Sequence, residues 1–168
     1  MQQALALELV SSLKEAGIDF FTYLPESRLS QILPLVQAER IFTVVPVASE
    51  AEGITIAAGA VLGGKQAACY LESSGLYVAS YSLLTIGKQL GVPVLLLVGF
   101  LGAFSDQRNS FLYATVGWRT VPLLDSLGIE SIVIVKGDGL KTKVKDAVRT
   151  MNALRSPVAL LFAGEFTV

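Results

Sequence analysis

The chain has 168 residues, of which 13 are lysine or arginine and 14 are aspartate or glutamate, so its net charge is −1. Charged residues make up 16% of the chain, against roughly 25% in ordinary soluble domains, and the mean hydropathy is +0.60. A chain so poor in charge is expected to bury part of its surface against a partner, and its charge argues against nucleic-acid binding. The length favours one domain, residues 1–168.

The residue types that are absent or rare limit the possible chemistry. The chain has no histidine, which excludes Ser-His-Asp and Cys-His catalytic arrangements and the usual zinc sites. Carboxylates, lysines, hydroxyls or a cofactor must therefore carry any chemistry. Cys69 is the one cysteine and stands in an apolar run, so we expect a buried thiol rather than a nucleophile or a disulfide.

The sequence also indicates a cellular location. The first residues lack the basic region of a secretory signal and carry Glu8 and Glu15 at helical spacing. The longest uncharged run, Gln89 to Ser105, contains Pro93 and several glycines and is too interrupted to span a bilayer. We therefore expect a cytoplasmic protein.

Helical and strand patterns alternate along the chain. The patterns predict helices at 4–16, 27–37, 49–63, 75–89, 120–127 and 140–154, and strands at 19–24, 41–47, 66–71, 93–99, 131–135 and 157–162. Because the strands are apolar and β-branched, they are expected to form a mainly parallel six-stranded sheet with helices on both faces. The predicted fold class is α/β, in three α/β/α layers. In such sheets, ligands bind beyond the carboxyl ends of the strands.

The predicted helix at 49–63 begins with a capping pattern that leaves one carboxylate unexplained. Ser49 is a good N-cap, and Glu52 three residues later completes a capping box. Glu50 is not needed for this box, and the helix macrodipole would give it only about 0.3–1 kcal/mol. Glu50 is therefore the residue whose presence remains to be explained. Gly63 and Gly64 are expected to end the helix.

The same helix is made almost wholly of small or apolar residues. Gly53, Ala57, Gly59 and Ala60 leave much of its circumference without bulk or charge. A helix of this kind is expected inside an assembly rather than on a solvated surface.

Two loops carry further candidate residues. The connection at 100–116 is long enough to act as a lid or binding loop, although a solvated loop tip explains it equally well. It contains Arg108. The segment Gly137-Asp138-Gly139 forms a strand-to-helix turn in which Asp138 is the expected N-cap of a helix starting near Leu140.

The order of elements and the stretch SEAEGITIAAGAVLGGK at 49–65 resemble the pyrimidine-binding (PYR) domain of thiamine diphosphate enzymes. The resemblance is nearest to the sulfopyruvate and phosphonopyruvate decarboxylases, where it matches the alpha subunit or the corresponding half, and it covers nearly the whole chain. In that family, a glutamate opens a helix of small residues that reaches Ala-Ala-Gly at the ninth position after it. Glu50 stands at that spacing from Gly59.

The resemblance implies a thiamine diphosphate-binding fold and a catalytic role for Glu50. The glutamate would hydrogen-bond a ring nitrogen of the cofactor's aminopyrimidine and so help to deprotonate the thiazolium carbon. Burial among apolar neighbours would raise the pKa of this carboxylate, which suits a group that shares a proton with a weak heterocyclic base. The resemblance also implies cofactor contacts from Pro25, Ser73, Ser74 and Gly75.

The resemblance further implies that the active site is divided between two chains. In the family, Gly-Asp-Gly opens a motif for Mg²⁺ and the diphosphate that ends in a later asparagine. Here Asn152 comes too early and no suitable asparagine follows. The Mg²⁺ ligands and the diphosphate site are therefore expected on a beta subunit, in a hetero-oligomer such as α2β2 or larger.

The implied activity is decarboxylation of a small acidic 2-oxo acid such as sulfopyruvate or phosphonopyruvate, with Arg108 as the candidate for holding the anionic end of the substrate. The stretch ESSGLYV at 72–78 departs from the family pattern, which leaves the substrate open. A carboligase or acyl-transferring enzyme of the same architecture is one alternative. A non-catalytic α/β interaction module is another.

Overall fold

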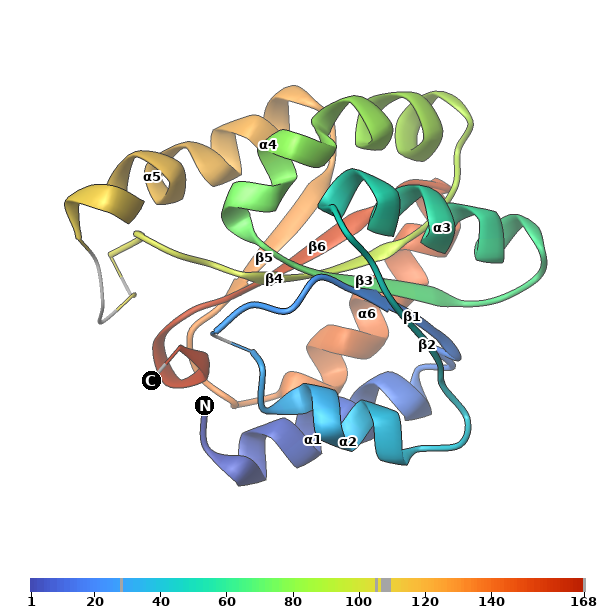
Figure 1. Ribbon diagram of the computed structural model, residues 1–168, viewed down its shortest axis with the longest axis horizontal. Helices are drawn as coiled ribbons and strands as arrows, with labels where there is room; N and C mark the ends of the chain where they lie inside the picture. Colours follow the sequence, from blue (N-terminus) through green and yellow to red (C-terminus); the bar gives the residue numbers. More distant parts are fainter. Residues whose placement is uncertain (28, 105, 107–109, 168) are drawn as a thin grey trace.

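The computed structural model describes residues 1–27, 29–104, 106 and 110–167. Its centre is a six-stranded parallel sheet in the order β2-β1-β3-β4-β6-β5 (Figure 1). The strands are β1 (Phe20–Tyr23), β2 (Thr43–Pro46), β3 (Ala67–Glu72), β4 (Leu95–Gly99), β5 (Glu130–Ile134) and β6 (Val158–Phe162). The predicted sheet is confirmed, and all its pairings are parallel.

Helices cover both faces of this sheet (Figure 1). They are α1 (Gln3–Glu15), α2 (Ile32–Ala38), α3 (Glu50–Leu62), α4 (Ser73–Ser82), α5 (Phe111–Ser126) and α6 (Leu140–Leu154), with a π-helix, η1 (Leu83–Gln89), after α4 and a 3₁₀-helix, η2 (Gly164–Phe166), near the end. In Figure 1, α1, α2 and α6 lie below the sheet and α3, α4 and α5 lie above it. The predicted three-layer α/β/α fold is therefore confirmed.

Each face of the sheet has its own apolar core. Successive strand residues point to opposite faces, so Tyr70 joins the core beneath α1, α2 and α6 while Leu71 joins the core beneath α3 and α4. The central strands β4 and β6 are buried along their whole length. Their uninterrupted apolar sequences reflect this burial on both faces.

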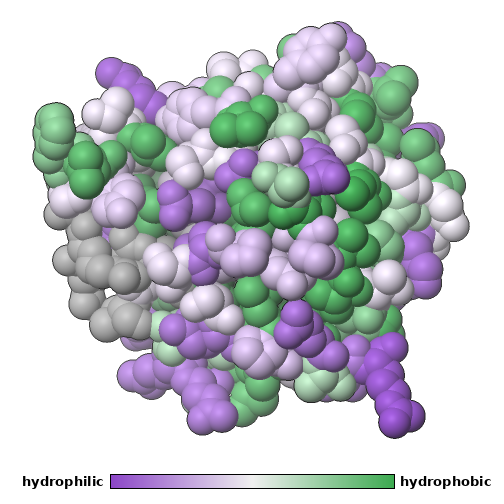
Figure 2. Space-filling view, viewed as in Figure 1, coloured by the Kyte–Doolittle hydropathy of each residue, from purple (hydrophilic) through white to green (hydrophobic). Residues whose placement is uncertain are grey.

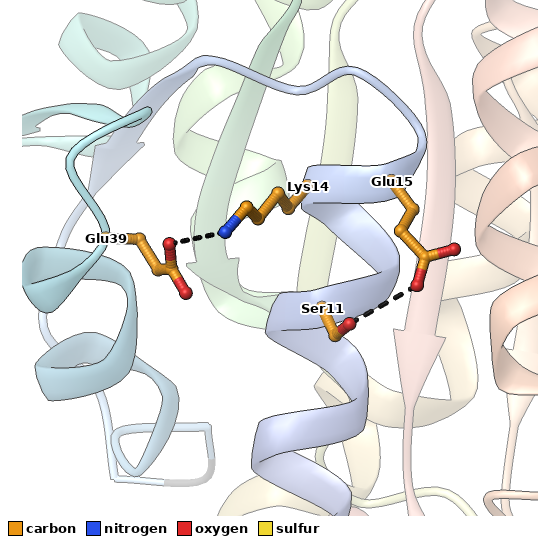
Figure 3. Close-up of polar contacts among 4 residues, drawn as sticks. All are labelled: Ser11, Lys14, Glu15 and Glu39. Atoms are coloured by element: carbon orange, nitrogen blue, oxygen red, sulfur yellow. Dashed lines mark hydrogen bonds and ion pairs between the residues drawn. The ribbon is translucent and has the colours of Figure 1, made fainter.

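Ion pairs on the surface add links between helices. Figure 3 shows Lys14 of α1 pointing toward Glu39, which follows α2, with 2.8 Å between Nζ and Oε2. Ser11 donates a hydrogen bond of 3.4 Å to Glu15 within α1. Lys141 of α6 also pairs with Glu15 and lowers the pKa of this carboxylate. These side chains are exposed, so the pairs stabilise the fold only weakly.

The segment before β5 differs from the prediction. The sequence predicted a helix at 120–127 and a long connection at 100–116, but α5 begins at Phe111. Gly117 and Pro122 lie inside this helix and weaken its sequence pattern. Packing explains the helix: a Cβ on Gly102 would lie 2.0 Å from the Tyr113 carbonyl oxygen, so the loop after β4 rests directly on α5.

Helix α2 is shorter than predicted. The sequence predicted a helix at 27–37, whereas α2 begins at Ile32. The Glu26 carboxylate accepts a 2.6 Å hydrogen bond from the Leu29 N–H, so Leu29 is held to the loop after β1 before the helix begins. Pro34 then lies in the first turn of the helix, where proline is tolerated.

The predicted N-cap of α6 is wrong. The N-cap residue is Gly139, which has a left-handed φ of 68°, and no side chain caps the helix. Asp138 is exposed, and its carbonyl oxygen accepts a 2.7 Å hydrogen bond from Lys143. The left-handed turn at Gly139 separates Asp138 from the helix start. Substitution of Asp138 is therefore not expected to remove a cap.

Gly117→Ala tests the packing of α5 against the loop after β4. A Cβ at this position would lie 2.1 Å from the Leu101 carbonyl oxygen, so the backbone must shift. We expect the free energy of unfolding in urea to fall by about 1–3 kcal/mol. The control is Gly59→Ala, where a Cβ would meet no atom within 4 Å; it should stabilise α3 by up to about 1 kcal/mol. Equal effects of the two substitutions would contradict this account.

Candidate functional site

Three neighbouring strands place most of the predicted site residues at the carboxyl end of the sheet. Strand β1 lies between β2 and β3, and all three run parallel. Pro25 follows β1, Glu50 begins the helix after β2, and Ser73 begins the helix directly after β3. The carboxyl ends of these strands therefore place the predicted cofactor-binding residues on adjacent loops and helix starts.

The side chain of Glu50 takes no part in capping the start of α3. Ser49 accepts a 3.3 Å hydrogen bond from the Glu52 N–H, as the capping box predicts. The Glu52 carboxylate accepts a 2.7 Å bond from the Ala48 N–H, one residue before the expected position. Among the residues that the structure describes, the Glu50 carboxylate has no hydrogen-bond or ion-pair partner. Glu52 therefore has the capping role, and the Glu50 carboxylate remains available to bind a ligand.

Glu50 lies directly over Gly75 of α4. A Cβ on Gly75 would come within 2.3 Å of the Glu50 Cγ and 2.6 Å of its Oε1. Glycine at this position is what allows the carboxylate to lie between the two helices. Glu50 is half-buried in this chain, so the burial that the resemblance implies is present in part.

The two serines at the start of α4 have different environments. The Ser73 hydroxyl is buried and accepts a 3.3 Å hydrogen bond from the Leu101 N–H, which ties the helix start to the loop after β4. The Ser74 hydroxyl donates a 2.8 Å hydrogen bond to Glu72. Pro25 is exposed. Of these predicted residues, Gly75 is the one shown in contact with Glu50, Ser73 anchors the start of α4, and the cofactor contacts of Pro25 and Ser74 stay predictions.

Cys69 of β3 lies beneath α3 and close to Glu50. A Cβ on Gly53 would lie 3.1 Å from the Cys69 Sγ, so helix and strand are in close contact. Burial raises the pKa of the thiol to about 12, and the negative charge of Glu50 acts in the same direction. The expectation of a buried thiol is confirmed. A thiol with this pKa stays neutral near neutral pH and is a poor nucleophile.

Glu26 has a role that the sequence alone did not reveal. Tyr70 of β3 donates a hydrogen bond to the Glu26 carboxylate, which also accepts from the Leu29 N–H. Burial raises the pKa of Tyr70, and the negative charge of Glu26 raises it further. Glu26 thereby holds the loop after β1 against β3. An acidic residue directly after Pro25 at a strand's carboxyl end was the available signal.

One predicted residue cannot be placed in this site. Arg108 lies outside the described residues, so its substrate role stays a prediction. The described residues contain no group of three or more His, Cys, Asp or Glu side chains able to hold a metal ion. No helix in the described part of the chain is both long and apolar enough to cross a bilayer.

The outer surfaces of α3 and α4 are rich in small and apolar groups. Gly53, Ile54, Ala57 and Ala58 form the buried face of α3, whereas Leu62 is 73% exposed. Helix α4 exposes hydrophobic side chains, namely Tyr77, Val78 and Tyr81. Figure 2 shows hydrophobic groups reaching the surface at several places on the face seen in Figure 1. Within this chain one face of α3 is buried, and the burial of α3 inside an assembly stays a prediction.

Comparison with known proteins agrees with the resemblance seen in the sequence. The chain is 27% identical over 157 residues to the sulfopyruvate decarboxylase subunit alpha of Methanocaldococcus jannaschii, which covers 94% of this chain and 92% of that protein. It is 26% identical to the corresponding subunit of Methanococcus maripaludis, over 88% of this chain and 87% of that protein. No protein-family model matches the chain.

The fold is also similar to that of a solved structure. The 2-oxoglutarate:ferredoxin oxidoreductase from Magnetococcus marinus, with 2-oxoglutarate, coenzyme A and succinyl-CoA bound, matches with a TM-score of 0.74 and 18% identity. The match covers 99% of this chain and 29% of that chain. The predicted resemblance to a PYR-type domain is confirmed by these matches taken together.

The raised pKa of Cys69 predicts a stability that depends on pH. Between the ordinary value of 9.0 and about 12, the folded chain keeps a proton that the unfolded chain has lost. The free energy of unfolding should therefore fall as pH rises through this range, by up to about 1.4 kcal/mol per pH unit from this group. Urea unfolding below and above pH 9 should show a smaller fall for Cys69→Ala. Identical pH dependence in both proteins would refute the assignment.

Proposed function

We propose that this chain is the α, pyrimidine-binding subunit of a two-chain thiamine diphosphate-dependent decarboxylase. The observation that carries the proposal is the Glu50 carboxylate, which lies over Gly75 at the carboxyl edge of the sheet and has no hydrogen-bond partner among the described residues. The similarity to two sulfopyruvate decarboxylase alpha subunits over most of both chains supports it. The substrate class we propose is a small acidic 2-oxo acid such as sulfopyruvate or phosphonopyruvate.

The residues present fit this cofactor. A partly buried carboxylate without a partner can share a proton with a ring nitrogen of the cofactor. A fully exposed carboxylate would do so only in competition with water. Gly75 leaves the space that the Glu50 side chain occupies. Thiamine diphosphate, when bound, supplies the electron sink for loss of CO₂. Pro25, Ser74 and Gly75 would border the cofactor, and Ser73 would fix the start of α4.

The diphosphate and Mg²⁺ would be held by a beta subunit. Asp138, in the Gly-Asp-Gly segment, follows β5, which lies at the opposite edge of the sheet from β2. It is therefore separated from Glu50 by the width of the sheet and does not belong to the same site. The exposed apolar residues of α3 and α4 suit burial against that subunit, which would also enclose Glu50. The proposed assembly is α2β2 or larger, in the cytoplasm.

Glu50→Gln is the test of the proposed role. The amide keeps the shape of the side chain but cannot take up the proton. In the complex with the beta subunit, proton–deuterium exchange at the thiazolium carbon of bound thiamine diphosphate should slow by about 100-fold or more. The free energy of unfolding should change by no more than about 1 kcal/mol, which is the size of a macrodipole contribution.

Glu52→Gln is the matched control for this substitution. Its side chain can still accept the hydrogen bond from the Ala48 N–H, so both exchange and stability should stay close to those of the wild type. If Glu50→Gln exchanges as fast as the wild-type complex, this chain does not supply the activating carboxylate.

The isolated chain should bind thiamine diphosphate poorly. The Mg²⁺ ligands are assigned to the beta subunit, and the half-buried Glu50 gives only one polar contact. Calorimetric titration with thiamine diphosphate and Mg²⁺ should detect binding by the reconstituted complex and little or none by the chain alone. Tight, Mg²⁺-dependent binding by the isolated chain would show that the site is not divided.

A further inference from the structure

Strand β5 is an edge of the sheet whose central residues lack the usual protection. Within the described residues it pairs with β6 on one side and with no strand on the other. Its apolar side chains remain accessible: Ile132 is 37% exposed and Val133 is 42% exposed. Edge strands are ordinarily blocked by charges, proline or a bulge. The run SIVIV at 131–135 has neither charge nor proline, whereas the opposite edge strand β2 ends in Pro46.

The backbone N–H and C=O groups of Val133 point away from the neighbouring strand β6. The Ala163 N–H donates a 2.9 Å hydrogen bond to the Ile134 carbonyl, so the polar groups of Ile134 face β6. Backbone groups alternate in direction along a strand, and those of Ile132 therefore also face β6. The N–H and C=O of Val133 lie between them and point outward. This residue offers one donor and one acceptor to a further strand.

Two opposite charges flank this position symmetrically. Glu130 lies three residues before Val133 and Lys136 three residues after it. Both are exposed, and neither forms an ion pair with another described residue. Glu130 is the first residue of β5, and Lys136 lies in a bend just past the end of the strand at Ile134. An antiparallel copy of the strand centred on Val133 would therefore bring the end that carries Lys136 beside Glu130 of the other copy, twice. A parallel copy in register would instead place like charges side by side.

We propose that two copies of this chain associate through antiparallel pairing of their β5 strands, with the two-fold axis at Val133. The two Val133 residues would exchange both backbone hydrogen bonds, and the flanking charges would fix the register. The Val135 carbonyl already accepts a 3.0 Å bond from the Glu165 N–H, so the new backbone ladder ends before Lys136, and Lys136 would reach Glu130 through its side chain alone. This proposal is independent of the proposed enzymatic function.

An apolar cavity next to β5 supports the same interface. It has a volume of about 290 Å³ and its lining includes Val133, Phe104 and Trp118. Phe104 and Trp118 pack edge to face with ring centroids 4.5 Å apart, yet they are 87% and 52% exposed. A second β5 strand would place its own Val133 beside the first, on the cavity side of the sheet. Pairing would thus bury apolar surface as well as satisfy backbone groups.

Exchange of the charges at Glu130 and Lys136 tests the register of the proposed strand pairing. The self-association of the full chain can be measured by sedimentation equilibrium. Glu130→Lys and Lys136→Glu each create two like-charge pairs and should weaken the dimer by about tenfold. The double variant restores opposite charges and should return the dissociation constant to within about twofold of the wild-type value. The control is Arg40→Glu, an equal charge change before β2 at the opposite edge, which should have no effect.

Val133→Pro tests the backbone contact. Proline removes an N–H that points outward, so the ladder with β6 should remain intact and thermal unfolding of the monomer should change little. Dimerisation should be lost. A wild-type chain that is monomeric at the highest concentration reached would overturn the proposal. So would a dimer that the single charge changes leave intact, or one that Arg40→Glu weakens equally.

Discussion

The structure depends on the close approach of α3 to the sheet on one side and to α4 on the other. Gly53 sets the first distance, because a Cβ there would lie 3.1 Å from the Cys69 Sγ and 3.4 Å from a methyl of Val47. Gly75 sets the second, because the Glu50 side chain fills the space where its Cβ would be. The Thr22 hydroxyl adds a 3.0 Å hydrogen bond to the Gly53 carbonyl. These contacts need small residues, which explains the composition of α3.

This packing also determines the chemistry that Glu50 can perform. A carboxylate at a helix start would normally be solvated or would cap the helix, but Glu52 already caps α3. The close contact with α4 removes part of the water around Glu50 without supplying a hydrogen-bond donor. Such a group keeps its capacity to bond a polar ligand atom. The free energy lost by leaving it unpaired is small in the isolated chain, because the side chain is still half-exposed.

Much of the fold could be predicted from the sequence because its signals are local. Apolar runs bounded by glycine or proline mark β3, β4 and β6, and Ser49 with Glu52 marks the start of α3. The incorrect predictions occur where contacts between distant segments or the local backbone determine where a helix begins. Helix α5 extends back to Phe111 because the loop after β4 packs on Gly117, and no nearby residue signals this. Asp138 failed as a cap because the left-handed Gly139 separates it from α6.

The site was predicted less completely than the fold, for a related reason. Family resemblance and helix spacing selected Glu50, and the strand order brought it beside Gly75. Glu26 was missed because its role depends on Tyr70, which is 44 residues away in the sequence and adjacent only in the folded sheet. Ser73 shows the converse case, since its hydroxyl is used to hold Leu101 rather than to face the site.

The two surfaces that we propose for contact with other chains would account for part of the low charge of the chain. The apolar residues of α4 lie on the helix that follows β3 and packs against α3, while Val133 lies on the edge strand β5 of the same sheet. These surfaces are separated by the width of the sheet, so one does not block the other. The partner that we propose around Glu50 would therefore leave β5 free to pair with a second copy. The proposed division of the site between chains and the proposed association of like chains would be compatible in one assembly.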